Sequence, residues 1–125
     1  MSQSLRVSNT NPTNPSPARL PEPPYYAVIF TSLRTDGDRG YQEMSARMDE
    51  LARQQPGFLG IESARTDGGL GITVSYWSNL EAVSAWKTQA DHRVAQVAGQ
   101  RAWYNNYSVR IARVERAYDW STDRG

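Results

Sequence analysis

Cysteine is absent from the chain, and histidine occurs once, at His92. The first absence excludes disulfides, thiol catalysis and cysteine-based metal sites, and it fits a cytoplasmic location. A metal site built on His92 would need carboxylate partners, and none stands at a recognisable ligand spacing. The sequence therefore predicts a cytoplasmic protein without a metal centre.

An excess of one charge sign and a long apolar run are missing as well. The 14 basic and 13 acidic residues are scattered and give a net charge of +1, which provides no electrostatic footprint for nucleic acid or an anionic membrane. No apolar run approaches the ~18 residues of a membrane span, and the N-terminus lacks the apolar core of a signal peptide. We therefore expect no nucleic-acid partner and no membrane partner.

The first 24 residues are rich in proline, which alternates with serine and asparagine. Few apolar groups accompany these residues, so burial cannot offset the entropy that the chain would lose on ordering. We expect residues 1–24 to form a disordered tail, either a solvated leader or a docking segment. Residues 25–120 are expected to form one folded domain, followed by a flexible C-terminus at 121–125.

Two hydrophobic periodicities organise the first half of the folded part. β-Branched and aromatic residues at 25–33 predict a strand, and apolar residues at helical spacing in 41–54 predict an amphipathic helix. Segments 58–66 and 71–77 predict two strands joined as a hairpin by a turn that contains Asp67 and two glycines.

The second half is expected to be helical and then extended. A capping box at Ser78–Glu81 begins a helix, and a second helical piece is expected at 91–102, with Asp91 as its N-cap. The last strand is expected at 107–118. Its alternation of apolar and polar residues slips near Ala112, which indicates a bulge or a strong twist there.

The resulting order, βαββαβ, is typical of a ferredoxin-like α+β sandwich, in which helices cover one face of an antiparallel sheet. The strands are rich in apolar and aromatic residues, which predicts burial on both faces of the sheet. The sheet of a second copy would cover the face without helices. We therefore expect a symmetric homodimer.

Four segments, in the right order, resemble the antibiotic biosynthesis monooxygenase superfamily. They are PGFLGIESAR, ITVSYWSNLEAVSAWK, the DH, AQ, G and WY of DHRVAQVAGQRAWY, and VRIARVERAYDW. The closer likeness is to a bacterial branch of monooxygenases without an assigned substrate. The resemblance covers about residues 25–120, and it implies a dimeric α+β barrel with a pocket between the helices and the sheet of each subunit.

The resemblance implies two kinds of chemistry. Cofactor-free oxygenases of the superfamily oxidise polycyclic phenols to quinones with O2, whereas other members degrade haem with an Asn on the first strand, a Trp on the second helix and a His ligand. Trp86 matches that Trp, but segment 25–33 has no Asn, and the aligned ligand position falls near Gln96 rather than at His92.

A cofactor-independent monooxygenase that acts on a small aromatic or polycyclic substrate with O2 is therefore the expected function. Haem binding or haem degradation is one alternative. A non-catalytic dimeric ligand-binding protein, whose aromatic residues merely form a core, is another.

His92 is the expected catalytic residue, because histidine titrates near neutral pH and suits a base that deprotonates a phenol. In the other interpretation, His92 only hydrogen-bonds locally at a junction of two helical pieces. An aromatic box for a flat ligand is expected around it, with Arg101 steadying an anionic oxygen. The expected substrate-binding residues are Trp86, Trp103, Tyr76, Phe30, Arg101 and Tyr107. The aromatic members can equally form a core, and Arg101 can equally form a surface ion pair.

Overall fold

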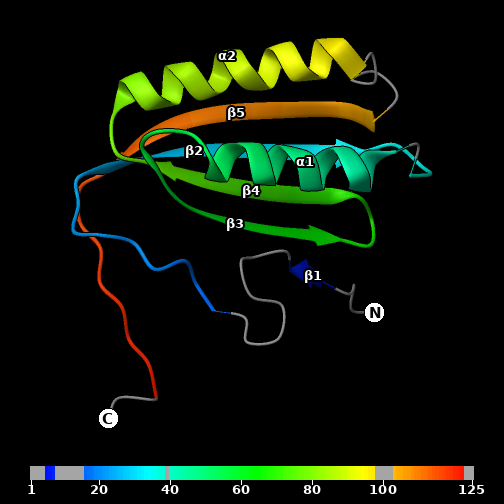
Figure 1. The fold of residues 1–125 in the computed structure, drawn as a ribbon. Helices are drawn as coiled ribbons and strands as arrows, with labels where there is room; N and C mark the ends of the chain where they lie inside the picture. Colours follow the sequence, from blue (N-terminus) through cyan, green and yellow to red (C-terminus); the bar gives the residue numbers. More distant parts are fainter. Residues whose placement is uncertain (1–4, 8–15, 39, 98–102, 123–125) are drawn as a thin grey trace.

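The structure is a computed structural model that describes residues 5–7, 16–38, 40–97 and 103–122. From the second strand onward the element order is the βαββαβ that the sequence predicts, and the ferredoxin-like α+β fold is confirmed. Both helices lie on one side of the antiparallel sheet (Figure 1). The elements are β1 (Leu5–Val7), β2 (Tyr25–Arg34), α1 (Tyr41–Arg53), β3 (Phe58–Thr66), β4 (Leu70–Trp77), α2 (Leu80–Val97) and β5 (Tyr104–Val114).

The pairing of β2 decides which side chains share a face of the sheet. The strand order is β1-β3-β4-β2-β5, so β2 pairs with both β4 and β5. Val28 lies opposite Ser75 on one side and opposite Ile111 on the other. Because directly opposite residues of an antiparallel pair point to the same face, these residues all point toward the helices. Their neighbours along each strand point to the opposite face, which we call the open face.

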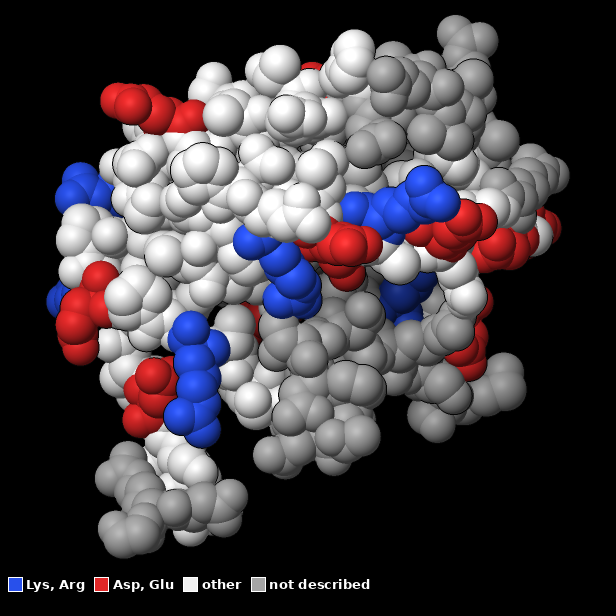
Figure 2. Space-filling view, viewed as in Figure 1, with Lys and Arg blue, Asp and Glu red and all other residues white. Residues whose placement is uncertain are grey.

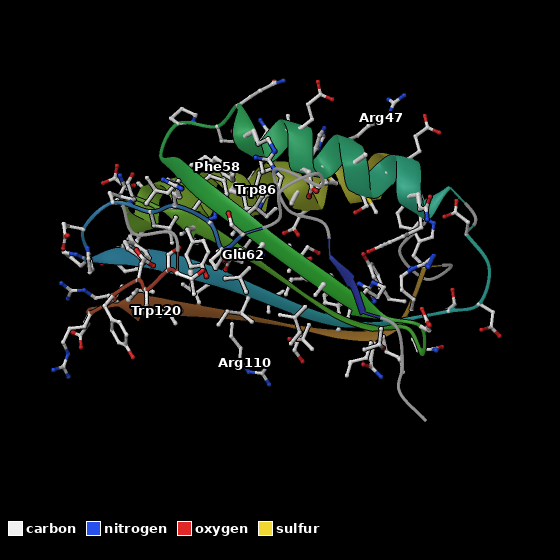
Figure 3. The ribbon with its side chains drawn as sticks, turned by 90° about the horizontal axis from the view of Figure 1, so that it is seen from below. Arg47, Phe58, Glu62, Trp86, Arg110 and Trp120 are labelled. Carbon is white, nitrogen blue, oxygen red and sulfur yellow. The ribbon has the colours of Figure 1, made fainter. Side chains whose placement is uncertain are left out.

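The core lies between the sheet and the helices. Trp77 is fully buried, and Ala52 of α1 and Val83 of α2 pack in the same cluster. The indole N–H of Trp77 donates to the Ser75 hydroxyl at 2.9 Å, so this buried donor is satisfied. Trp86 stacks on Trp77 with ring centroids 5.7 Å apart. Figure 3 shows Trp86 between the sheet and the helices.

The second helix differs from the sequence-based expectation in two ways. It runs unbroken through Asp91, which is no N-cap but pairs with Lys87 at 2.9 Å, one helical turn earlier. The expected capping box is also displaced, because the Asn79 side chain accepts the backbone N–H of Ala82 at 2.8 Å. Asn79 is therefore the residue that caps α2.

The bulge of the last strand lies at the opposite end from where the alternation placed it. Pairing between β2 and β5 is regular through Ala112, so the bulge expected there was wrong. The register shifts instead between Leu33 and Arg34, which face Asn106 and Tyr104. One extra residue, Asn105, therefore stands in β5 at this point. The apparent slip in alternation arises because Val114 pairs with Tyr25, so its side chain lies on the open face.

The N-terminal segment contacts the open face beside β3. β1 pairs antiparallel with the end of β3, and the backbone N–H of Ala18 donates to the Glu62 carboxylate at 2.9 Å. A Cβ atom on Gly60 would lie 3.0 Å from Leu20, so the segment passes directly over this glycine. The sequence predicted none of these contacts. The division into tail, domain and C-terminus stays a prediction.

Among the described residues on the face shown in Figure 2, acidic and basic side chains are interleaved. Within the described residues, neither helix has the length and apolar character of a membrane span.

Two glycines with the same backbone conformation allow the packing of α2 to be measured. Gly57 and Gly40 have φ values of +84° and +83°, but a Cβ on Gly57 would lie 2.6 Å from Ala82, whereas one on Gly40 would meet nothing within 4 Å. We expect Gly40→Ala to lower the free energy of unfolding by about 1 kcal/mol through backbone strain alone.

Gly57→Ala should cost about 1–3 kcal/mol more than Gly40→Ala, because overpacking is added to the same strain. Urea unfolding of the two variants at one protein concentration measures the difference. Equal losses in the two variants would show that Gly57 is not packed against α2.

Candidate functional site

Three aromatic rings meet on the helix-facing side of the sheet, at the end where β2 finishes and β5 begins. Phe30 lies 5.5 Å from Tyr104 and 5.3 Å from Tyr107, measured between ring centroids. Tyr104 and Tyr107 themselves are 5.8 Å apart. Residues at this odd spacing would point to opposite faces of a regular strand, so the bulge at Asn105 is what brings both rings to the same face.

The first turn of α1 adds a fourth ring to this cluster. Tyr41 packs edge to face with Tyr104 at 5.8 Å and contacts Trp103 at 6.4 Å. Asp38 accepts the backbone N–H groups of Gly40 and Gln42, so its carboxylate satisfies free amides at the start of α1. This capping fixes where the helix begins and thereby the position of Tyr41.

Two arginines flank the ring of Tyr41. The guanidinium carbon of Arg34, at the end of β2, lies 3.7 Å from the ring centroid, and that of Arg65, on β3, lies at 5.6 Å. Arg65 also donates to the Tyr41 hydroxyl at 3.2 Å. Both arginines are half-buried, so their cation–π contacts are only partly screened by water.

Arg65 is held by neutral oxygens. It donates to the hydroxyl of the buried Ser32 at 2.7 Å and to the Ser32 carbonyl at 3.3 Å, and it also donates to the carbonyl of Gly69. A Cβ on Gly71 would lie 2.5 Å from the guanidinium carbon. Glycine at this position therefore leaves the space in which the guanidinium lies.

A strip of apolar surface runs away from the ring cluster along the helix-facing side of β5. Tyr107, Val109 and Ile111 are 43%, 47% and 49% exposed, although each faces the same side as the core residue Val28. The described part of α2 therefore leaves this strip uncovered. Together with the aromatic cluster, it forms the candidate functional site, a flat apolar surface with two cations at one end.

The structure brings together Phe30, Tyr107 and, through Tyr41, Trp103, which are three of the residues expected to bind substrate. It places Trp86 elsewhere, stacked on Trp77 in the core. Their roles as substrate-binding residues stay predictions.

The remaining expected residues lie away from this cluster. Tyr76 faces the open side, where its hydroxyl donates to Glu62 at 2.7 Å. His92 is exposed on α2, and it follows the buried Val83 by nine residues, half a turn around the helix axis. It therefore points away from the sheet. Arg101 lies outside the described residues.

The sequence analysis missed Arg34, Tyr41 and Arg65, because they are far apart in the chain and belong to three elements. One feature of the sequence could have pointed to Arg34. Arg34 has the same parity along β2 as Val28, so strict alternation predicts that its charge lies on the helix-facing side, where a cation needs partners.

Burial keeps several tyrosines of the fold neutral. Burial and then the neighbouring Tyr41 raise the pKa of Tyr104, against the opposing effect of the two arginines. On the open face, burial raises the pKa of Tyr76, and its hydrogen bond to Glu62 raises it further. Burial likewise raises the pKa of Tyr25, with a smaller contribution from Asp119.

Comparison with known proteins supports the resemblance seen in the sequence. The sequence model described as "Antibiotic biosynthesis monooxygenase" matches residues 24–98. The uncharacterized protein YqjZ of Bacillus subtilis (strain 168) is 50% identical over 99 residues, which cover 79% of this chain and 87% of that protein.

Solved structures show the same fold at low sequence identity. SnoaB of Streptomyces nogalater, a cofactor-independent oxygenase, superposes with a TM-score of 0.60 at 12% identity, covering 82% of this chain and all of SnoaB. PA3566 of Pseudomonas aeruginosa gives a TM-score of 0.58 at 18% identity, covering 78% of this chain and 98% of that one. At these identities the likeness concerns the fold alone.

The raised tyrosine pKa values predict how stability depends on pH. Below about pH 10 these phenols are neutral in both the folded and the unfolded chain. Above that pH the unfolded chain loses protons that the folded protein retains, so the free energy of unfolding should fall as pH rises. Removing the hydroxyl in Tyr104→Phe should make this fall shallower, by up to about 1.4 kcal/mol per pH unit.

Urea unfolding between pH 9 and pH 11 measures this dependence. Tyr118→Phe is the matched control, because Tyr118 is 93% exposed and its removal should leave the slope unchanged. If the stability of the Tyr104→Phe variant fell with pH as steeply as that of the parent protein, the raised pKa of Tyr104 would be contradicted.

Proposed function

Because the chain belongs to the antibiotic biosynthesis monooxygenase family, we propose that it is a cofactor-independent monooxygenase that oxidises a small aromatic or polycyclic phenol with O2. The family match spans more than half of the chain. The activity named for SnoaB supports the proposal by analogy of fold, and the chain's own residues must supply the rest of the argument.

The observation that carries the proposal is the exposed strip on β5 beside the aromatic cluster. Tyr107, Val109 and Ile111 present an apolar surface on the side of the sheet that otherwise forms the core. The rings of Phe30 and Tyr104 continue this surface. A flat aromatic molecule can stack on this exposed apolar strip beside the aromatic rings.

The proposed reaction needs no electron donor besides the substrate. Removal of the phenol proton makes the ring electron-rich, so that it can transfer electrons to O2. One oxygen atom forms a new carbonyl on the ring, the other leaves as water, and the phenol becomes a quinone. His92 remains our proposed base for the first step. His92 lies on the outer side of α2 and does not face the β5 strip, so the variant His92→Ala described below is the direct test of this role.

Haem chemistry fits the described residues less well. Trp86, the one residue that matches the haem-degrading members, stacks on Trp77 in the core. His92 follows it by six residues, about 120° around the helix axis, and β2 has no Asn. The arrangement used by those members is therefore not reproduced, and we assign no step to haem.

We also propose that the protein is a homodimer joined through its open faces. Leu70 and Ile72 of β4 are 51% and 46% exposed there, and Figure 3 shows Arg110 on the same side, away from the helices. The sheet of a second copy would bury these apolar side chains. Because both copies present the same surface, the contact would be two-fold symmetric.

The oxygenase proposal predicts O2 consumption in the presence of a polycyclic phenol, without added metal or cofactor. We expect His92→Ala to lower kcat about 100-fold or more if it is the base. Tyr107→Ala should lower kcat/KM about tenfold through the lost aromatic contact. An oxygen electrode and quinone absorbance measure both quantities.

Tyr118→Ala is the control, because Tyr118 is exposed and lies outside the site. Undiminished turnover in His92→Ala would remove His92 as the base. If a broad set of phenols caused no O2 uptake, the non-catalytic ligand-binding alternative would take the place of the oxygenase.

The dimer proposal predicts a molecular mass of two chains at micromolar concentration. Leu70→Asp should shift the protein toward monomer, because it would bury a charge in the interface. Leu80→Asp is the matched control, since Leu80 is similarly exposed but lies at the start of α2. Light scattering measures both. A monomeric parent protein would refute the proposal.

A further inference from the structure

We propose that Arg34 and Arg65 form a subsite for the carboxylate of a flat aromatic acid, whose ring lies along the β5 strip. The inference rests on the proposed function, because it names the substrate class of that same site. It differs from the sequence-based expectation, which gave the anion-steadying role to Arg101.

The two guanidiniums converge on one ring. Both lie within 6 Å of the Tyr41 centroid, at 3.7 Å for Arg34 and 5.6 Å for Arg65. Tyr104, which hydrogen-bonds Tyr41, experiences both positive charges. The two cations therefore act on one small region of the helix-facing side.

Neither cation has an acidic partner in the part of the chain that the structure describes. Arg34 donates to the carbonyls of Gly37 and Asp38 at 3.2 Å, and Arg65 donates to neutral oxygens only. Among the described residues, no carboxylate forms a salt bridge with either arginine. The nearest acid in sequence, Asp38, has both carboxylate oxygens engaged with backbone N–H groups of α1.

This arrangement leaves the site with a net positive charge and with one buried donor that has no acceptor. The Nε–H of Arg34 is buried and has no hydrogen-bond acceptor. Two half-buried like charges raise each other's energy, and an unmatched buried donor costs further free energy. A bound anion beside the two guanidiniums would lower the first of these costs. Arginine suits a carboxylate in particular, because its planar fork can donate two parallel hydrogen bonds.

The surface next to the cations defines the rest of the ligand. Phe30, Tyr104 and Tyr107 pack against one another beside the cations, and Val109 and Ile111 continue the apolar strip. A molecule that matches both parts has a flat apolar body and a negative charge at one end. An aromatic carboxylic acid has this shape and this charge distribution.

Three naphthalene probes separate the possible sources of affinity. 2-Naphthoate carries the carboxylate, 2-naphthamide has nearly the same shape without the charge, and 2-naphthol is a neutral phenol at pH 7. Titration of the full-length protein with each probe, by calorimetry at fixed ionic strength, gives three dissociation constants. We expect 2-naphthoate to bind at least about tenfold more tightly than the other two, as charge-assisted hydrogen bonds imply.

Arg34→Gln should remove this preference and leave the binding of 2-naphthamide unchanged. Arg34→Lys should restore only part of it, because lysine keeps the charge but not the fork. Arg47→Gln is the control, since Arg47 is exposed on α1 and pairs with Glu43, and it should keep the full preference. Arg34 is chosen over Arg65 because Arg34 bonds only to carbonyls three and four residues away, whereas Arg65 joins β3 to Ser32 of β2 and to Tyr41. Thermal unfolding verifies that each variant is folded.

Equal binding of 2-naphthoate and 2-naphthamide, or no binding of either, would overturn the inference, as would an unchanged preference in Arg34→Gln. Tighter binding of 2-naphthol would assign the cations to a phenolic oxygen and equally refute the carboxylate subsite. The oxygenase proposal fails separately: a preference for 2-naphthoate, together with no O2 uptake on a broad set of phenols, would keep the subsite and remove the reaction. Turnover of neutral phenols without a preference for 2-naphthoate would keep the oxygenase reaction and remove the carboxylate subsite.

Discussion

The pairing of β2 with two neighbours at once is the constraint on which the rest of the structure depends. A central strand must place the same alternate residues against β4 and β5, so its register divides the sheet into a helix-facing side and an open side. The core around Trp77 and the aromatic cluster around Phe30 lie on the first side. Glu62, Tyr76 and the N-terminal segment meet on the second. The proposed binding site and the proposed dimer interface therefore lie on opposite faces of the sheet.

A single irregularity in the pairing of β2 with β5 determines which side chains meet at the candidate site. The bulge at Asn105 lets Tyr104 and Tyr107 occupy the same face, where regular alternation would have separated them. The resulting ring cluster reaches α1 through Tyr41. Gly71 contributes in the same place by leaving room for the Arg65 guanidinium. Gly71 and the bulge at Asn105 contribute no reactive side chain, but they determine where the aromatic rings and the cations meet.

The local hydrophobic patterns of the sequence predicted the fold well, but they did not predict the contacts between residues far apart in the chain. The strands expected at 25–33 and 58–66 match β2 and β3 to within one residue. They were predictable because strand-forming residues alternate between the two faces of a sheet with a period of two. The expected helix break at Asp91 was wrong, since the side chain pairs with Lys87 inside a continuous α2. The site was harder to predict than the fold. Arg34, Tyr41 and Arg65 become neighbours only through strand order, which no local pattern specifies.

The division between the two faces also bears on which predicted residues can act together. Tyr76 lies in the open face beside Tyr25, 5.8 Å away, and the sheet itself separates it from Phe30. One substrate molecule on the β5 strip therefore cannot contact both Tyr76 and Phe30. His92 is separated from the strip differently, by the thickness of α2, because it lies half a turn from Val83. Of the charged groups that the structure describes on the helix-facing side, Arg34 and Arg65 lie beside the aromatic rings. The charge that the structure places beside the rings is therefore the fixed positive charge of these two arginines, and His92 lies apart from it.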